Sequence, residues 1–222
     1  MKALIIGATG ATGKDLVNVL LRDPEYTAVT IFVRCPTGIS NLKLTEVLTD
    51  FENLDEVSGQ INGEVLFCCL GTTLKAAGSK DNQQHIDYEI PLDFAVLAKS
   101  NGVKRMVLLS AYGASAKSRV FYSRLKGMLE DGVAKLGFDQ YITFRPGLLV
   151  RKNSDRVGER ISEGLLNFLN GIGIARKFKP LPTALLAEKM AMAPKVFNGG
   201  QLFLELDEIF KDKLEAGAPK KQ

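Results

Sequence analysis

Residues 1–13 read MKALIIGATGATG. An apolar run over residues 3–6 leads directly into glycines at positions 7, 10 and 13. Glycine permits backbone angles and a close approach that a Cβ atom would forbid, and the start of a following helix offers unpaired N–H groups and a positive dipole end to an anion. The stretch therefore predicts a strand, a phosphate-binding turn and a helix, with a dinucleotide pyrophosphate as the expected anion.

The glycine spacing by itself leaves an ordinary tight turn as an alternative. It is G-x-x-G-x-x-G and differs from the commonest dinucleotide fingerprint, G-x-G-x-x-G. The residues that follow favour the functional interpretation, because apolar side chains repeat at helical spacing from Lys14 to Arg22.

The composition is that of one globular domain spanning residues 1–222. The chain is 45% hydrophobic and carries a formal net charge of +4, with basic and acidic residues mostly interspersed. Basic clusters occur at residues 151–160 and 176–179, but no aromatic ladder runs between them, so we expect no nucleic-acid partner. A solvated face or an anion-binding rim is the preferred interpretation of these clusters.

Three cysteines are too few for a disulfide framework. Cys68 and Cys69 are adjacent in an apolar strand-like run, so their side chains should point to opposite faces and pack as buried thiols. No secretory signal is recognised, no apolar run reaches the ~20 residues needed to span a bilayer, and no metal site is expected. These features predict a cytoplasmic protein without a membrane span.

Short apolar runs alternate with helical patterns along the chain. This alternation predicts an α/β fold: a doubly wound, mostly parallel Rossmann sheet of about seven strands with helices on both faces. Pro91 lies inside one helical pattern and should begin its second half or kink it, and Asp207 is expected to cap a short terminal helix. The expected strands are residues 3–6, 28–33, 46–51, 64–70, 104–109, 140–144 and 202–206, and the main helices are 14–22, 83–100, 119–136 and 183–192, with a short helix from Asn53 and a loop over 78–82.

Arg34 follows the second expected strand. In dinucleotide-binding folds this position meets the adenosine ribose, where an acidic residue selects NAD and an arginine accommodates the 2′-phosphate of NADP. The sequence has no acid here, and a guanidinium suits phosphate through its fixed donor fork. We therefore expect NADP(H), with an unspecialised surface arginine as the alternative.

A polar turn and a lone histidine are two further candidate positions. The fourth expected strand runs into Gly71, Thr72 and Thr73, a small polar turn at the strand end where open α/β sheets bind ligands. His85 is the only histidine, and a structural or exposed role is preferred for it over a catalytic one.

Tyr122 and Lys126 form a candidate catalytic pair with Ser110. A spacing of four residues places Tyr122 and Lys126 on one helical face. A phenol is ordinarily a poor acid or base at neutral pH, and an adjacent ammonium favours the phenolate. The tyrosine could then exchange a proton with a carbonyl or alcohol oxygen beside a nicotinamide, and Ser110, at the end of the fifth expected strand, could hydrogen-bond the same oxygen.

The sequence resembles the short-chain dehydrogenase/reductase family, and within it the atypical, Tat-interacting-protein-like branch. The resemblance covers nearly the whole chain, and FCCLGTT and the FRPG turn are more specific than the glycine pattern. The matching motifs are GATGATG at residues 7–13, DFENLD from Asp50, FCCLGTT at 67–73, LLSAYGA around Ser110, YSRLKGMLE from Tyr122 and FRPGLL at 144–149.

The resemblance implies a set of residues around bound NADPH. The glycine turn would hold the phosphates, Arg34 the 2′-phosphate, and Lys126 the nicotinamide ribose. The implied set is Gly7, Thr9, Gly10, Ala11 and Thr12 in the first turn, Arg34, Asp50 and Phe51 toward the adenosine, Gly71 and Thr72 along the phosphate-ribose path, Lys126, and Arg145, Pro146, Gly147 and Leu148 around the nicotinamide.

One position departs from the wider family, whose members often carry two serines at the end of the fifth strand. The second is Ala111 here, which leaves two functions open: a reductase of a small carbonyl compound, or an NADPH-binding sensor whose output is a contact with a protein partner. An isomerase or dehydratase using tightly held NAD is disfavoured by Arg34. Residues 151–180 are expected to form a substrate-side lid, the substrate has no readable motif, and the apolar helix faces fit a monomer or a homodimer.

Overall fold

The computed structural model describes residues 1–150 and 180–211, and these contain a seven-stranded parallel sheet. Its order is β3-β2-β1-β4-β5-β6-β9, so the chain reverses its direction of winding between β1 and β4. The doubly wound α/β fold predicted from the alternating pattern is confirmed. The strands are β1 (Lys2–Ile6), β2 (Ala28–Val33), β3 (Leu44–Leu48), β4 (Val65–Cys68), β5 (Arg105–Leu109), β6 (Gln140–Arg145) and β9 (Gly200–Glu205).

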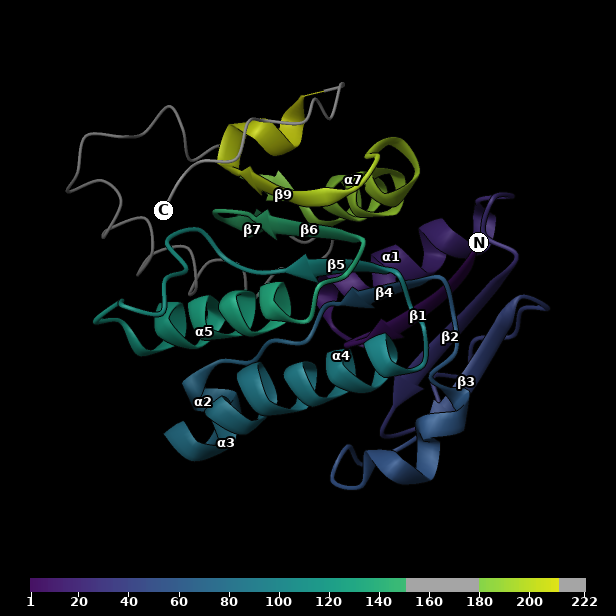
Figure 1. Ribbon diagram of the computed structural model, residues 1–222, viewed down its shortest axis with the longest axis horizontal. Helices are drawn as coiled ribbons and strands as arrows, with labels where there is room; N and C mark the ends of the chain where they lie inside the picture. The colour runs from purple at the N-terminus through teal and green to yellow at the C-terminus, as the bar shows by residue number, and fades with distance from the viewer. Residues whose placement is uncertain (151–179, 212–222) are drawn as a thin grey trace.

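Helices cover both faces of the sheet (Figure 1). One face packs against α1 (Ala11–Arg22) and α7 (Thr183–Val196), which lie side by side, and the other against α4 (Ile90–Ser100) and α5 (Phe121–Lys135). Strand side chains alternate between the two cores, since Ile5 packs with the α1 side and Leu4 with the α4 side. Cys68 packs on the α4 side and Cys69 on the α1 side, so the prediction that their side chains point to opposite faces is confirmed.

Several expected boundaries need correction. The third strand covers Leu44–Leu48 and ends before Asp50, and the expected loop at 78–82 contains the start of α3 (Lys80–Gln84), which follows the short α2 (Leu74–Ala77). The expected helix over 83–100 is interrupted by a π-helical turn, η2 (His85–Glu89), immediately before Pro91 in the first turn of α4. The prediction that Asp207 caps the terminal helix is wrong, because Glu205 caps the 3-10 helix η3 (Leu206–Phe210). The Glu205 side chain accepts the backbone N–H of Glu208, and the Glu208 side chain accepts the backbone N–H of Glu205.

Two elements have no counterpart in the sequence prediction. Strands β7 (Leu149–Val150) and β8 (Leu181–Pro182) form a separate two-stranded parallel sheet, which was not expected because each has only two residues.

The 3-10 helix η1 (Leu54–Gln60) matches the short helix expected from Asn53. No helix in the two described ranges is both long and apolar enough to cross a membrane.

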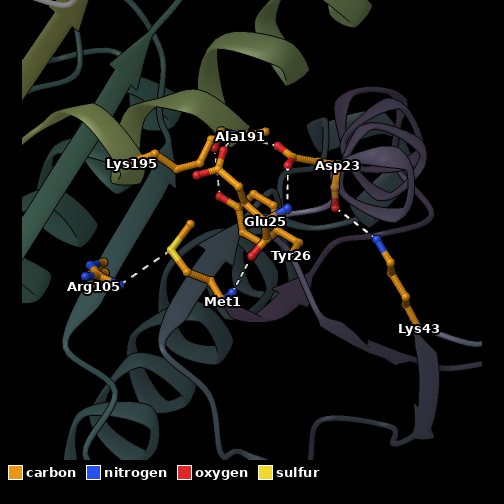
Figure 2. Close-up of polar contacts among 8 residues, drawn as sticks. All are labelled: Met1, Asp23, Glu25, Tyr26, Lys43, Arg105, Ala191 and Lys195. Atoms are coloured by element: carbon orange, nitrogen blue, oxygen red, sulfur yellow. Dashed lines mark hydrogen bonds and ion pairs between the residues drawn. The ribbon is translucent and has the colours of Figure 1, made fainter.

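At the amino ends of the strands, polar contacts join α7, the loop after α1 and the first residues of the sheet (Figure 2). The Tyr26 hydroxyl donates to the Ala191 carbonyl at 2.7 Å, and the Lys195 ammonium bridges Asp23, at 2.7 Å, and Glu25. These contacts fasten α7 to the loop after α1. Ligands of open α/β sheets bind at the opposite edge, outside the carboxyl ends of the strands.

Candidate functional site

The glycine turn lies at the point where the sheet order reverses. Gly7 has a φ of +79°, and a Cβ on it would lie 2.5 Å from the carbonyl carbon of Cys69, in the segment after β4. Gly10 begins α1 without a side-chain cap, and the first turn of α1 contains no acidic residue. Thr9 and Gly10 are exposed, Ala11 is half-buried and Thr12 is buried. The turn therefore combines a close backbone approach with helix N–H groups that no side chain caps, the geometry that suits an anionic phosphate.

Arg34 and Asp50 lie at neighbouring strand ends. Arg34 is exposed directly after β2, and its guanidinium makes no hydrogen bond or ion pair with any described residue. Asp50 is also exposed, and its carboxylate accepts the Glu52 N–H at 2.9 Å. The guanidinium is thus available to an anionic ligand at this end of β2.

Phe51 occupies an unusual backbone position beside this pair. Its φ is +71°, in the left-handed region that favours glycine, and its side chain is buried in the core beneath α4. Strained positions of this kind tend to occur where function requires them. The ring of Phe51 is used in packing, so only its backbone is available at the sheet edge.

Gly71 and Thr72 form the turn after β4, and Lys126 reaches this turn from α5. Lys126 is only 1% exposed, and its ammonium donates to the Leu70 carbonyl at 2.8 Å. A Cβ on Gly71 would lie 3.6 Å from the Lys126 Nζ atom. The structure thus joins a residue of α5 to the end of β4.

Ser110 and Tyr122 carry hydroxyl groups without a partner in the described structure. Ser110 is 5% exposed, its N–H donates to the Phe144 carbonyl at 2.8 Å, and its Oγ is buried without a hydrogen bond. A buried polar group is normally hydrogen-bonded, so an orphaned hydroxyl at a sheet edge fits a site that pairs with a ligand. Tyr122 is 37% exposed in the first turn of α5, one turn before Lys126.

The segment Arg145 to Leu148 lies next to Ser110, and the Arg145 side chain is already paired with two carboxylates. The Tyr112 N–H donates to the Pro146 carbonyl at 3.0 Å, which extends the pairing of β5 and β6 beyond both strands. The Arg145 Nε lies 3.0 Å from Glu130, and Glu205 holds the other end of the guanidinium. Burial opposes the charge of Arg145, but these carboxylates raise its pKa. The paired guanidinium joins α5, β6 and β9. Pro146 and Leu148 are buried, and Gly147 is half-buried.

The His85 ring is paired with two glutamates. Its ring nitrogens lie 3.0 Å from Glu89 and 3.2 Å from Glu52, consistent with the structural role preferred from the sequence. Asp87, two residues later, was missed: it is completely buried and accepts the Thr72 N–H at 2.7 Å. The sequence signal for Asp87 is an acidic residue at a position of a helical pattern that faces the core. Because acids are almost never fully buried unless they are paired, such a residue indicates a buried partner.

A cavity of about 530 Å³ lies at the opposite edge of the sheet, away from these residues. Arg105, Lys195, Glu25 and Glu64 contribute its charged lining. Lys195 is already paired with Glu25, so the cavity shows none of the unpartnered groups found at the carboxyl edge. The expected lid at 151–180 lies outside the described residues except for residue 180.

Comparison with known proteins shows the family to which the chain belongs. Residues 7–165 match the model of a family described as NAD(P)H-binding. Protein FMP52, mitochondrial, of Candida albicans is 35% identical over 208 residues, 90% of each chain. Protein HTATIP2 of Rattus norvegicus is 39% identical over 160 residues, 70% of this chain and 66% of that protein.

Solved structures show the same fold. A short-chain dehydrogenase/reductase superfamily protein from Agrobacterium tumefaciens with bound NAD superposes with a TM-score of 0.70 at 15% identity, covering 93% of this chain and 77% of that one. The oxidoreductase ylbE from Lactococcus lactis gives a TM-score of 0.64 at 16% identity, over 88% and 85% of the two chains.

The expectation of a cytoplasmic protein is wrong. Similar proteins from Candida albicans, Emericella nidulans and Scheffersomyces stipitis, 32–35% identical to this chain, are named as mitochondrial. Few cysteines, the lack of a recognised secretory signal and the lack of a long apolar run do not determine the compartment.

Proposed function

The chain belongs to the NAD(P)H-binding family of short-chain dehydrogenase/reductase type, and from that premise we propose that it is an NADPH-dependent reductase of a small carbonyl compound. The family resemblance predicted from the motifs is confirmed. The observation that carries the proposal is the buried Ser110 hydroxyl, which has no partner in the described structure and lies at the same sheet edge as Tyr122 and Lys126.

The residues present fit a nicotinamide dinucleotide. Gly7 and Gly13 leave no room for a Cβ, so the backbone turn is shaped for a close approach by phosphate. The exposed and unpaired Arg34 supports NADPH over NADH, because it stands where an acid would otherwise bind the 2′-hydroxyl.

Bound NADPH would supply a hydride to the carbonyl carbon. In the proposed reaction the Tyr122 hydroxyl gives its proton to the carbonyl oxygen, which completes the alcohol. Ser110 donates a hydrogen bond to the same oxygen and orients it. Lys126 places a positive charge one helical turn from Tyr122, where it stabilises the phenolate left behind.

The test is a titration of the purified protein with NADPH and NADH, followed by assays of a panel of carbonyl compounds. We expect NADPH fluorescence to change on binding, tighter binding of NADPH than of NADH, and oxidation of NADPH with at least one carbonyl. Tyr122→Phe should bind NADPH normally and lose turnover. Full turnover by this variant would refute the assignment of the acid.

Ala111 favours one second candidate, a sensor that binds NADPH and acts through a protein contact. The residue lies half-buried directly after Ser110 and offers no hydroxyl to a substrate. NADPH binding without turnover of any carbonyl, together with a partner affinity that changes with NADPH, would support the sensor over the reductase.

We also propose a mitochondrial location, on the basis of the names of the FMP52 relatives. Fractionation of cells that express the full-length protein provides the test. Recovery with a matrix or membrane marker of mitochondria is expected, and recovery only with a cytosolic marker would contradict the proposal.

A further inference from the structure

The loop over residues 111–119 joins β5 to α5 and connects two members of the proposed catalytic set. Ser110 directly precedes the loop, and Tyr122 follows it in the first turn of α5. Within the loop only Ala114 is buried, and the other residues are half-buried or exposed. The position of the loop therefore depends on contacts of its backbone with the neighbouring elements.

Gly127 allows the loop backbone to approach α5 closely. A Cβ on Gly127 would lie 2.1 Å from the carbonyl carbon of Ser115 and 2.2 Å from the nitrogen of Ala116, far inside the ordinary contact distance of 3.4–4 Å. The Ser115 N–H donates to the Ser123 carbonyl at 3.0 Å. Ser123 and Gly127 are four residues apart, so they share one face of α5, and the loop lies along it beside the face that carries Tyr122.

The end of the loop also shapes the first turn of α5. The Val120 N–H donates to the Ser118 hydroxyl oxygen at 3.2 Å, and the Arg124 guanidinium donates to the Ser118 carbonyl at 3.2 Å. The same guanidinium lies 5.4 Å from the centre of the Phe121 ring. Because the first turn of a helix has N–H groups without partners inside the helix, contacts with the preceding loop help to hold this turn, and Tyr122 with it.

The rest of α5 is fastened to the sheet independently of the loop. Leu129 and Val133 are completely buried in the core beneath the helix, and Glu130 is paired with Arg145 of β6. A side chain at position 127 would therefore displace the loop, which has few buried contacts, and leave the helix body in place.

We propose that Gly127 is a positioning residue of the reductase: by admitting the loop backbone against α5, it fixes the first turn of that helix and, through it, the Tyr122 hydroxyl. This proposal rests on the proposed function, in which Tyr122 gives its proton to the carbonyl oxygen. It assigns a role in turnover to a glycine that has no side chain to contact cofactor or substrate.

The test compares Gly127→Ala with Gly132→Ala, after thermal unfolding has shown that both variants fold. Both glycines lie within α5, so each change adds one methyl group and the same gain in helix propensity. A Cβ on Gly132 would lie 3.0 Å from a terminal methyl carbon of Leu92, a flexible side chain, whereas the obstacle at Gly127 is backbone. A difference between the two variants therefore reports the contact with the loop.

The first readout is independent of activity. Lys117 and Arg119 are exposed in the loop, so cleavage by trypsin after either residue, measured by mass spectrometry on the native protein, reports how often the loop opens. Cleavage of a locally opened segment follows the population of the open form, and we expect Gly127→Ala to be cut at these sites at least about tenfold faster than wild type. Gly132→Ala should be cut at the wild-type rate.

The second readout separates turnover from cofactor binding. A misplacement of about 1 Å can cost about 100-fold in rate, so kcat of Gly127→Ala should fall roughly 10- to 100-fold with a carbonyl that wild type reduces. Its NADPH dissociation constant should stay within about threefold of wild type, because the glycine turn and Arg34 lie on other elements. Gly132→Ala should match wild type in both measurements.

Equal cleavage rates in the two variants would overturn the loop contact. A wild-type kcat in Gly127→Ala despite faster cleavage would overturn the positioning of Tyr122. If Gly127→Ala does not fold, Arg124→Met decides in its place, because methionine has no donor for the Ser118 carbonyl. Faster cleavage after Lys117 together with a lower kcat in Arg124→Met would support the proposal, and wild-type values of both would overturn it.

The failure of the proposed function has a different signature. A wild-type protein that binds NADPH but reduces no carbonyl would refute the reductase and, with it, the role of Gly127 in turnover. The trypsin comparison would still decide whether Gly127 holds the loop against α5. An active wild type with two indistinguishable glycine variants would refute the role of Gly127 alone.

Discussion

Gly13 packs against Gly7 so closely that a Cβ on Gly13 would lie 2.1 Å from the Gly7 carbonyl oxygen. The obstacle is backbone, so no flexible side chain can move away. Gly13→Ala should therefore shift α1 away from the turn, destabilise the protein by about 1–3 kcal/mol as overpacking does, and weaken NADPH binding. Denaturant unfolding and NADPH titration measure the two effects.

Gly59→Ala provides the control for this prediction. No heavy atom lies within 4 Å of a Cβ at Gly59, and its φ is not positive. It should change stability little and leave NADPH binding unchanged. A stable Gly13→Ala variant with normal affinity would contradict the close-approach account of the turn.

Arg34→Ala tests cofactor choice. Hydrogen bonds to charged groups contribute about 1.5–3 kcal/mol, so loss of the guanidinium should weaken NADPH binding roughly 10- to 150-fold. NADH lacks the 2′-phosphate, and its affinity should hardly change. Paired titrations with NADPH and NADH measure the ratio, and an equal loss for both would argue against a contact with the 2′-phosphate.

Ser110→Ala should separate activity from stability. Removing a donor that stabilises a reacting oxygen costs on the order of 100- to 1000-fold in kcat, while removing an unpartnered buried hydroxyl should leave stability unchanged or raise it. Carbonyl reduction and thermal unfolding are the measurements. Ser100→Ala, at an exposed hydroxyl that bonds the Leu97 carbonyl, is the control. Destabilisation with unchanged turnover would show that Ser110 is structural.

His85 should make stability fall as the pH rises above about 6.5. Its hydrogen bond with Glu89 raises the pKa of His85 above the ordinary 6.5, burial opposes this, and Glu52 adds to it. Because the folded pKa is the higher one, protonation stabilises the fold: the contribution is complete below pH 6.5 and is lost as the pH rises through the folded pKa.

The measurement is the free energy of unfolding of wild type and His85→Gln at pH 6 and pH 8.5. The difference between the two proteins should be larger at pH 6, by less than about 1 kcal/mol because solvent screens this partly exposed pair. A difference that grows toward pH 8.5 would contradict the assigned sign.

Glu130→Gln tests the Arg145 pairing. Glu130 is 4% exposed, and breaking a buried pair costs about 3–5 kcal/mol; the remaining contact with Glu205 should keep the loss near the lower value. Asp139→Asn, which breaks a partly exposed pair with Lys99 at 3.6 Å, should cost less than about 1 kcal/mol. Equal losses in the two variants would mean that the buried pair has no special structural role.

Local pattern alone was sufficient for the features that depend on near neighbours along the chain. The strand at Ala28–Val33, the glycine turn before α1 and the one-turn spacing of Tyr122 and Lys126 all follow from short-range periodicity and glycine sterics. Alternation of strands and helices was enough to predict the doubly wound sheet, because parallel strands need helical crossovers. These features required no knowledge of which distant segments meet.

Only the tertiary structure decided which polar side chains have hydrogen-bond or ion-pair partners within the protein. It brings Lys126 to Leu70, places Asp87 on Thr72 through a π turn, and joins Arg145 to Glu130 and Glu205. A polar residue in a sequence carries no record of its partner, since that partner depends on strand order and on the rotation of helices packed far away along the chain. For the same reason the sequence could identify the cofactor turn, but only the folded chain shows what holds that turn in place.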